Sequence, residues 1–399
     1  MTAQDTSKLA KWMLPEGIEE TLPVEARMLE QLRRRLLDHF NSCGYDMVMT
    51  PFIEYLDALL AGSGNELDMQ TFKVTDSNSG RQMGIRADMT LQAARIDAHQ
   101  IKQNEPVRLC YLGTVLRTVN DGFAGSRAPL QVGAELYGHA GVESDLEILE
   151  LMLQTLSLTG LKDVHIDLGH VGIFRSLSRQ AGLQTTDEQL LFDALQRKAI
   201  PEIAGLLERL KLGKDMTAWF TALADLNGGT ETLQRAKDIF ADAAVEVVAA
   251  LDDMIRISTL IEERMPDLPV HYDLAELRGY AYQTGLVFAA FVPGYGQEIA
   301  RGGRYDDIGS IFGRARPATG FSADLKTLIH LSSPQTRKPV AAIYAPDDQE
   351  LALREKIISL RQSGERVIVA LPGQTGGAVE MGCDRILQKQ DGHWQVVSV

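Results

Sequence analysis

Apolar residues first recur at helical spacing and then give way to alternating segments. Residues 23–42 carry apolar side chains three or four positions apart, which predicts an amphipathic helix ending near Gly44. The stretch YDMVMTPFIEY that follows predicts a strand limited at Pro51, because proline cannot donate to a sheet ladder. Next come FKVTD and RQMGIRADM, which are separated by the turn NSG and predict a hairpin.

The clearest pair of strands lies within residues 107–138. VRLCYLGTVLR and PLQVGAELYG are joined by a polar loop, which favours antiparallel pairing. Alternation in the second strand sends one set of side chains to each face. The apolar set is Leu130, Val132, Ala134 and Leu136, and the opposite set is Gln131, Gly133, Glu135 and Tyr137. The polar set indicates either a solvated outer face or a binding surface.

The remaining pattern predicts a helical insertion and a separate end unit. VESDLEILELMLQTLSLTG predicts a helix, VHIDLGHVGIF a strand, and residues 173–265 helices almost throughout. Strands return in VHYDL and TGLVFAAFV, followed by turn-rich GGRYDDIGSIFGRARPATGF and the helix SADLKTLIHL. After Pro334 and Pro339, a strand, a helix and a strand predict a compact α/β unit. The predicted division is a core of residues 1–172 and 266–336, an insertion at 173–265 and a C-terminal domain at 337–399.

Composition narrows the class of protein. The 399 residues are 45% apolar and carry a formal net charge of −14. A nucleic-acid backbone is usually bound by a basic surface, so nucleic acid is not an expected partner. The basic run Arg33–Arg35 lies on the predicted first helix among acidic residues and indicates a solvated helix face.

Several features favour a cytoplasmic protein. No apolar run approaches the ~20 residues that span a bilayer, and the N-terminus lacks the apolar stretch of a signal peptide. Cys43, Cys110 and Cys383 are far apart, which predicts reduced thiols and argues against disulfides and structural zinc. The histidines show no metal-ligand spacing, and LPGQTGG lacks the lysine of a phosphate-binding loop.

One group of polar residues has the chemistry of an amino-acid pocket. Gly133 leaves room over the sheet beside Glu135, whose carboxylate could bind an amino group or an imidazole. Arg278 offers a bidentate fork for a carboxylate, and Asp88 and Thr90 in IRADMT add oxygen acceptors. We find no arrangement of a nucleophile and a base in the sequence.

Four segments in order resemble the class II histidyl-tRNA synthetases, along most of residues 10–335. They are YDMVMTPFIEYLDAL, VRLCYLGTVLR with LQVGAELYG, ELRGYAYQTG, and GGRYDDIGSIFGRARPATGF. The resemblance implies an α+β fold, in which an antiparallel sheet is flanked by helices with a helical insertion and a small α/β C-terminal unit.

Departures from the synthetase pattern fall on the ATP half of the site. Arg117 remains in the second motif, but Val119 replaces a glutamate. In the third motif Thr327 stands in place of the ATP-binding arginine, and Asp324 puts a negative charge in place of a glycine. Losing a cation and adding a carboxylate both oppose phosphate chemistry. Gln283 replaces a tyrosine, and the C-terminal unit is shorter than the family's anticodon-binding domain.

This pattern is similar to the ATP phosphoribosyltransferase regulatory subunits, a non-catalytic branch of the synthetase family. The resemblance implies a histidine site in which Asp88, Thr90 and Gln131 hold the α-amino group. Glu135 and Tyr305 would then face the imidazole and Arg278 the carboxylate. Arg117 and Tyr282 complete the predicted set, in which no residue is catalytic and none binds a metal.

The implied function is regulatory. The chain would activate a short catalytic ATP phosphoribosyltransferase subunit in histidine biosynthesis and mediate feedback inhibition by histidine. It would form a homodimer within a hetero-oligomer, without a cofactor, nucleic acid or membrane. The alternatives are an active histidyl-tRNA synthetase and a synthetase-like protein that modifies another substrate with ATP. The histidine site could also lie at a subunit interface.

Overall fold

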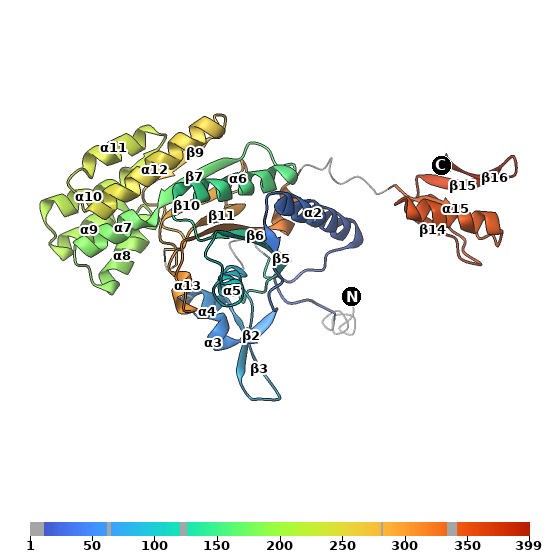
Figure 1. The fold of residues 1–399 in the computed structure, drawn as a ribbon, viewed down its shortest axis with the longest axis horizontal. Coiled ribbons are helices and arrows are strands. Elements are labelled where there is room, and N and C mark those ends of the chain that lie inside the picture. The colour runs from blue at the N-terminus through green and yellow to red at the C-terminus, as the bar shows by residue number, and fades with distance from the viewer. Residues whose placement is uncertain (1–11, 62–64, 120–125, 281, 333–340) are drawn as a thin grey trace, which may run out of the picture. The chain divides into compact units, whose positions relative to one another are not determined.

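The structure is a computed structural model that describes residues 12–61, 65–119, 126–280, 282–332 and 341–399. The chain forms two compact units, residues 1–333 and residues 334–399 (Figure 1). The first unit contains a large and a small sheet, the second unit contains one sheet, and each unit has its own buried core.

A nine-stranded sheet forms the centre of the first unit, in the order β1-β5-β6-β12-β11-β10-β7-β9-β8. Its strands are β1 (Asp46–Met47), β5 (Val107–Thr114), β6 (Leu130–Tyr137), β7 (His165–His170), β8 (Asn227–Gly228), β9 (Val270–Asp273), β10 (Leu286–Phe291), β11 (Ala300–Arg304) and β12 (Ala318–Asp324). Neighbours from β5 through β7 all pair antiparallel, whereas β1 with β5 and β7 with β9 are parallel. The predicted antiparallel α+β architecture is confirmed.

Three helices cover the apolar face of this sheet. They are α2 (Pro23–Ser42), α6 (Val142–Leu158) and α14 (Leu325–Leu331). All three contribute to the core that also contains Val132, Ala134 and Leu136 of β6. The helical periodicity at 23–42 and the alternation in β6 therefore predicted correctly which side chains of β6 pack with the helices. The polar set of β6 lies on the opposite face.

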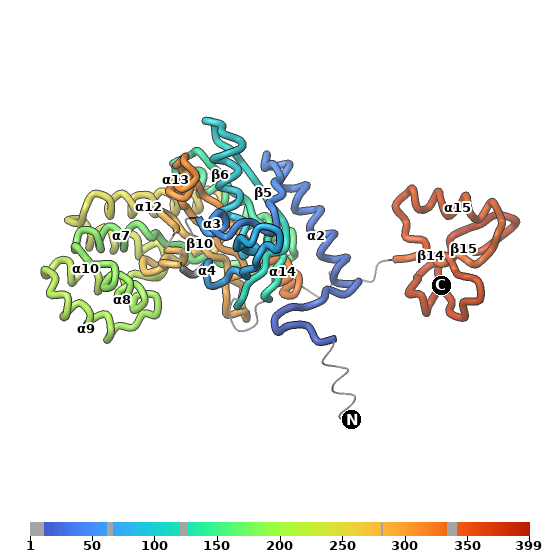
Figure 2. The backbone as a smooth tube through the Cα atoms, turned by 90° about the horizontal axis from the view of Figure 1, so that it is seen from below, coloured from blue at the N-terminus to red at the C-terminus, as the bar shows by residue number. Residues whose placement is uncertain are grey.

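The helical insertion packs beside β7 and shares the core of the sheet. Its helices are α7 (Val171–Gln180), α8 (Thr185–Gln196), α9 (Ile200–Leu210), α10 (Lys214–Asp225), α11 (Glu231–Ile239) and α12 (Val245–Arg264). They gather at one end of the unit, where α12 contacts α6, α7 and β7 (Figure 2). Residues 171–174, predicted as strand, open α7 instead, because the His170 ring accepts a bond from the Gly172 N–H and caps that helix.

Pro51 separates two strands that enter different sheets. β1 joins the large sheet, and β2 (Ile53–Tyr55) joins β4 (Gln82–Ile85) and β3 (Phe72–Thr75) in a small one. The predicted hairpin of β3 and β4 is confirmed. Short helices complete this region, namely α3 (Leu56–Leu59), α4 (Asn65–Gln70), α5 (Thr90–Ile96), the π-helix η1 (Asp97–Ile101) and α13 (Ile308–Ile311).

The turn-rich prediction for residues 302–321 is wrong in part, because β11 and β12 are adjacent strands of the large sheet. Their glycines mark close packing instead of turns. A Cβ at Gly302 would lie 2.3 Å from the Gly320 carbonyl oxygen, so a side chain would push the strands apart. Glycine in a strand often marks such a close approach.

The second unit has the predicted strand–helix–strand order and then a hairpin. Its elements are β13 (Ile343–Ala345), α15 (Leu351–Gln362), β14 (Val367–Val369), β15 (Arg385–Gln390) and β16 (His393–Ser398). β13 lies between β14 and β15 and is parallel to both. In the loop LPGQTGG, the Gly377 N–H donates to the Glu380 carboxylate at 2.9 Å. The negative charge of Glu380 beside this loop disfavours the binding of a phosphate.

Candidate functional site

Glu135 forms the base of the site, on the face of β6 away from helices α2, α6 and α14. It is 1% exposed, so this polar face is not a solvated surface. The Tyr111 hydroxyl donates to Oε1 at 2.8 Å, and the Tyr305 hydroxyl donates to Oε2. Thr90 Oγ1 lies 3.1 Å from the Tyr111 hydroxyl and extends this buried network. Burial raises the pKa of Glu135 to about 8, although the tyrosine hydroxyls act in the opposite direction.

Two glycines make room for this network. A Cβ at Gly320 would lie 1.5 Å from Glu135 Oε2, and a Cβ at Gly133 would lie 2.5 Å from the Tyr111 hydroxyl oxygen. Gly133 was expected from the sequence to leave room over the sheet, whereas Tyr111 and Gly320 were not expected at the site. Tyr111 lies directly opposite Gly133 in the pairing of β5 with β6, a register that the sequence does not fix across the loop that joins these strands.

Asp88, Thr90 and Gln131 hold one another at the edge of the site. Gln131 Nε2 donates to Asp88 Oδ2 at 2.6 Å, and its Oε1 accepts from the Met89 N–H at 3.1 Å. Asp88 Oδ1 accepts from the Thr90 N–H at 2.7 Å, where α5 begins. These bonds fix the carboxylate of Asp88 and the side-chain oxygen of Gln131 in place. Both groups are acceptors, so they can receive an ammonium group without further ordering of side chains.

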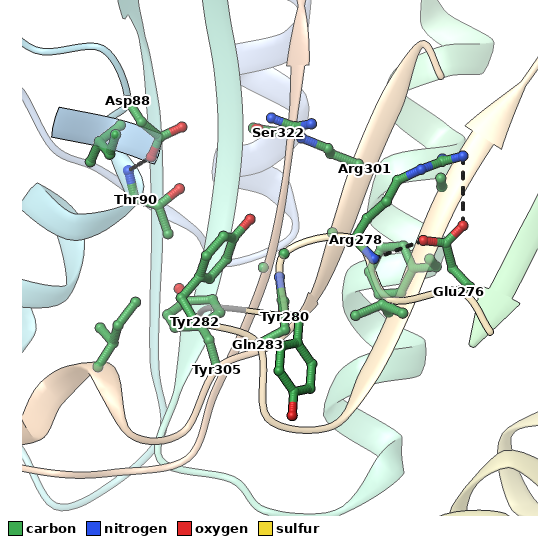
Figure 3. Close-up of a pocket in the computed structure, with 18 of the residues that line it drawn as sticks. Asp88, Thr90, Glu276, Arg278, Tyr280, Tyr282, Gln283, Arg301, Tyr305 and Ser322 are labelled. Carbon is green, nitrogen blue, oxygen red and sulfur yellow. Dashed lines mark hydrogen bonds and ion pairs between the residues drawn. The ribbon is translucent and has the colours of Figure 1, made fainter. Parts of the chain in front are cut away.

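The loop at residues 276–283 brings Arg278 and Tyr282 to the opposite wall. Arg278 Nη2 lies 3.6 Å from Glu276 Oε2, and Nη1 lies 3.6 Å from Glu298 Oε2. Tyr282 points toward Thr90, whereas the Arg278 guanidinium turns toward Glu276 (Figure 3). The loop is also tied to the helical insertion through Tyr280. Its carbonyl oxygen accepts from Arg175 Nη2 at 2.6 Å, and its hydroxyl donates to Glu188.

The predicted residues surround two adjoining cavities. A cavity of about 1190 Å³ is lined by Asp88, Thr90, Arg117, Glu135, Arg278, Tyr282 and Tyr305. Gln131 lines the neighbouring cavity of about 150 Å³, and Arg117 lines both. Arg301 and Ser322 also line both cavities, and the sequence analysis missed them. The larger cavity reaches the size that binds drug-sized ligands, about 300–1000 Å³, so it has room for an amino acid.

Asp324 occupies the wall of the smaller cavity as a helix cap. Its carboxylate accepts from the backbone N–H groups of Lys326 at 3.1 Å and Thr327 at 3.3 Å, at the start of α14. It also accepts from the Thr327 hydroxyl at 2.8 Å and from the Leu130 N–H at 2.9 Å. The helix terminus that could have received an anion is therefore already bonded to a carboxylate of the chain itself.

The described ranges contain no cluster of three histidine, cysteine, aspartate or glutamate side chains that could hold a metal. His170 is 6% exposed and serves as the cap of α7. Burial lowers the pKa of His170 to about 4, so it stays neutral. In those ranges no helix has the length and apolar character to cross a membrane.

The pKa of Glu135 predicts a pH effect on stability. Burial raises this pKa from 4.5 to about 8, so between these values the folded state holds a proton that the unfolded state releases. Stability therefore falls as pH rises through this window, by at most about 1.4 kcal/mol per pH unit. Glu135→Gln removes the titrating group. Thermal unfolding at pH 5 and pH 8 should show the variant gaining stability relative to the wild type at the higher pH. An equal difference at both pH values would contradict the assignment.

Comparisons with known proteins find matches to both units of the chain. A family model described as histidyl-tRNA synthetase matches residues 17–328. Another, described as the ATP phosphoribosyltransferase subunit HisZ C-terminal domain, matches residues 340–397. Among solved structures, an ATP phosphoribosyltransferase regulatory subunit/histidyl-tRNA synthetase from Bacillus halodurans superposes with a TM-score of 0.82 at 26% identity, covering 94% of this chain and 97% of the other. A histidyl-tRNA synthetase from Nostoc has a TM-score of 0.78 at 19% identity, covering 97% of both chains, and shares the fold.

Curated relatives extend the match along nearly the whole chain. A protein from Thioalkalivibrio sulfidiphilus is 54% identical over 390 residues, covering 98% of this chain and 99% of the relative. A protein from Alkalilimnicola ehrlichii is 54% identical over 387 residues, covering 97% and 96%. Both are named ATP phosphoribosyltransferase regulatory subunit. The resemblance stated from the sequence motifs is thus confirmed, and the chain belongs to the family of ATP phosphoribosyltransferase regulatory subunits.

Proposed function

We propose that this regulatory subunit activates a short catalytic ATP phosphoribosyltransferase subunit and makes it sensitive to histidine, without catalysing a reaction itself. The observation that carries the proposal is a contrast between the two cavities. The larger one keeps a buried acceptor network around Glu135, and the smaller one has a volume of only about 150 Å³ and contains the Asp324 carboxylate beside Arg117 and Arg301. An amino-acid pocket without its nucleotide half suits a sensor of an amino acid.

Histidine fits the chemistry of the larger cavity. Glu135 can accept a hydrogen bond from an imidazole N–H while the hydroxyls of Tyr111 and Tyr305 hold its carboxylate in place. Asp88, Thr90 and Gln131 suit the α-amino group. Tyr282 faces Thr90 across the cavity, where it can cover the ligand (Figure 3). The carboxylate of the bound histidine then needs a guanidinium partner. Three arginines line the cavity, namely Arg117, Arg278 and Arg301.

Co-purification with the short catalytic subunit is the test of this function. The complex should form from separately purified subunits, and phosphoribosyl transfer should be faster in the complex than with the catalytic subunit alone. Histidine should slow the complex more than it slows the catalytic subunit alone. A chain that neither binds nor activates the catalytic subunit would refute the proposal. In the proposed setting the protein acts in the cytoplasm and needs no cofactor.

We expect no histidine-dependent exchange between ATP and pyrophosphate. The cavity beside Asp324 has a volume of about 150 Å³, below the roughly 300 Å³ at which ligand pockets begin. Asp324 adds a negative charge there, and Thr327 supplies no cation. Val119→Glu should not rescue exchange, because these two residues remain. An active histidyl-tRNA synthetase, assayed in parallel, provides the positive control. Exchange that depends on both ATP and histidine would contradict the prediction.

We also propose a homodimer, formed around β1 and β2. Each of these strands ends the order of its sheet, and exposed apolar side chains lie on and between them. Met49 is 81% exposed, Phe52 43% and Ile53 41%. Burying such a patch between two copies would stabilise a symmetric pair. Sedimentation should show a dimer at micromolar concentration and a shift toward monomer for Met49→Asp. A folded wild-type monomer under these conditions would contradict this proposal.

A further inference from the structure

Arg301 lies on the same face of the sheet as Glu135 and Gln131, although it is two strands away. It pairs with Ser322 of β12, and Ser322 pairs with Gly133 of β6. Paired residues share a face, and Gly133 sits between Gln131 and Glu135 along β6. Arg301 therefore projects from the cavity face, level with the gap between these two side chains.

The spacing suits an amino acid lying across the sheet. Strands are about 4.8 Å apart, so the backbones of β6 and β11 are separated by roughly 10 Å. Glu135 marks one end of that interval and Arg301 the other. Position 322 between them carries only a serine, and position 133 carries a glycine. No large side chain therefore fills the cavity between Glu135 and Arg301 at these two positions.

Arg278 has a different setting. It belongs to the loop that contains Glu276, and its guanidinium lies 3.6 Å from both Glu276 and Glu298. Arg301 shares Glu298, since its Nη1 donates to Glu298 Oε1 at 3.3 Å. In Figure 3 Arg278 turns toward Glu276, whereas the Arg301 guanidinium lies beside Ser322 on the side of the cavity where Asp88 is found. Arg301 and Arg117 both line the junction of the two cavities, and Arg278 lines only the larger one.

We propose that Arg301, together with Arg117, holds the carboxylate of the bound histidine, so that Arg301 and not Arg278 sets the preference for a free amino acid over an analogue that lacks the carboxylate. The inference rests on the proposed function, since it needs histidine in the larger cavity. The imidazole then lies over Glu135, the ammonium group at Asp88 and Gln131, and the carboxylate at the junction of the cavities. Arg278 stays beside Glu276, and Arg301 uses its remaining N–H groups for the carboxylate while Nη1 stays bonded to Glu298.

Calorimetric titration of the full-length chain with histidine and with histidinol, which lacks the carboxylate, tests the inference. The wild type should bind histidine roughly ten- to a hundredfold more tightly than histidinol, the range expected for a charge-assisted contact. Arg301→Gln should weaken the binding of histidine by up to that factor and leave the affinity for histidinol unchanged. Arg278→Gln is the matched control and should keep the preference. Arg301→Lys, which keeps the charge but loses the fork, should lie between the wild type and Arg301→Gln.

The outcomes separate this inference from the proposed function. If the wild type prefers histidine and Arg301→Gln keeps that preference in full, the carboxylate lies elsewhere and only the inference falls. Loss of the preference in Arg278→Gln alone would return the role to Arg278. If the wild type binds neither compound, the proposed function fails and the inference fails with it. Circular dichroism of each variant controls for folding, and Arg301 is suited to substitution because 45% of its side chain is exposed.

Discussion

Glu135→Gln is expected to raise the histidine concentration that half-inhibits the assembled ATP phosphoribosyltransferase by roughly ten- to a hundredfold. Glu135 is buried at the base of the larger cavity, and Asp88, a carboxylate that lines the same cavity, is bonded to Gln131 and to the Thr90 N–H. The amide has the same shape, and the hydroxyls of Tyr111 and Tyr305 can still hold it. Because the pKa of Glu135 is about 8 in the empty cavity, the group becomes a carboxylate when a positively charged imidazole ring pairs with it. The amide cannot ionise, so the variant should lose this charge-assisted contact and keep the fold.

Inhibition curves of the complex measure this effect, with Glu147→Gln as the control. Glu147 also accepts from a tyrosine hydroxyl, that of Tyr45 at 2.9 Å, but it pairs with Arg108 outside the cavity. The control should leave inhibition unchanged, and both variants should still activate the catalytic subunit without histidine. An unaltered curve for a folded, assembled Glu135→Gln complex would mean that histidine acts elsewhere, such as at an interface with the catalytic subunit.

Arg304→Met is expected to lower the free energy of unfolding of the first unit by about 3–5 kcal/mol, the cost of leaving one partner of a buried ion pair alone. Arg304 Nε and Nη2 donate to Asp145 Oδ2 at 3.1 and 2.9 Å. The side chains are 9% and 1% exposed. The same guanidinium bonds the Gly141 carbonyl and the Ser144 hydroxyl, so it joins the start of α6 to β11. Methionine fills the volume but leaves the Asp145 carboxylate without its cation.

Chemical denaturation of the variant, followed by circular dichroism, checks the prediction. Arg197→Met is the matched control, since Arg197 pairs with Glu202 in an ion pair whose side chains are 60% and 44% exposed. Exposed ion pairs contribute about 1 kcal/mol or less to the free energy of unfolding, so the stability of this variant should remain near that of the wild type. Adding Asp145→Leu to Arg304→Met should recover part of the loss, because the uncompensated buried charge disappears. A loss below about 1 kcal/mol in Arg304→Met would contradict the assigned role.

Local pattern was sufficient for the parts of the fold that depend on neighbours in sequence. The spacing at residues 23–42 predicted α2, and alternation in β6 placed Gln131 and Glu135 on one face. Pro51 was correctly read as a strand limit. These predictions succeeded because helix and strand periods are set by backbone geometry over a few residues. The order of four motifs also predicted the family.

The strands β11 and β12 could not be predicted in this way. Their segments are rich in glycine and turn residues, and they become strands only because β6 and β10 lie on either side of them. A glycine such as Gly320 carries no local signal for its role. Its missing side chain matters because the Glu135 carboxylate, 185 positions earlier in the chain, occupies that space. Pairings between such distant segments follow from the whole sheet.

The sequence by itself determined the family, the faces of β6 and the loss of the ATP-binding groups at positions 119 and 327. Each of these depends only on residue identities and their spacing within short motifs. Tertiary structure alone decided that the polar face of β6 is buried, that Tyr111 and Tyr305 hold Glu135, and that Asp324 caps α14. It also decided that Arg301 projects from the cavity face of the sheet while Arg278 turns toward Glu276. The physical reason is that burial, cross-strand register and competition among charges arise only when distant segments pack together.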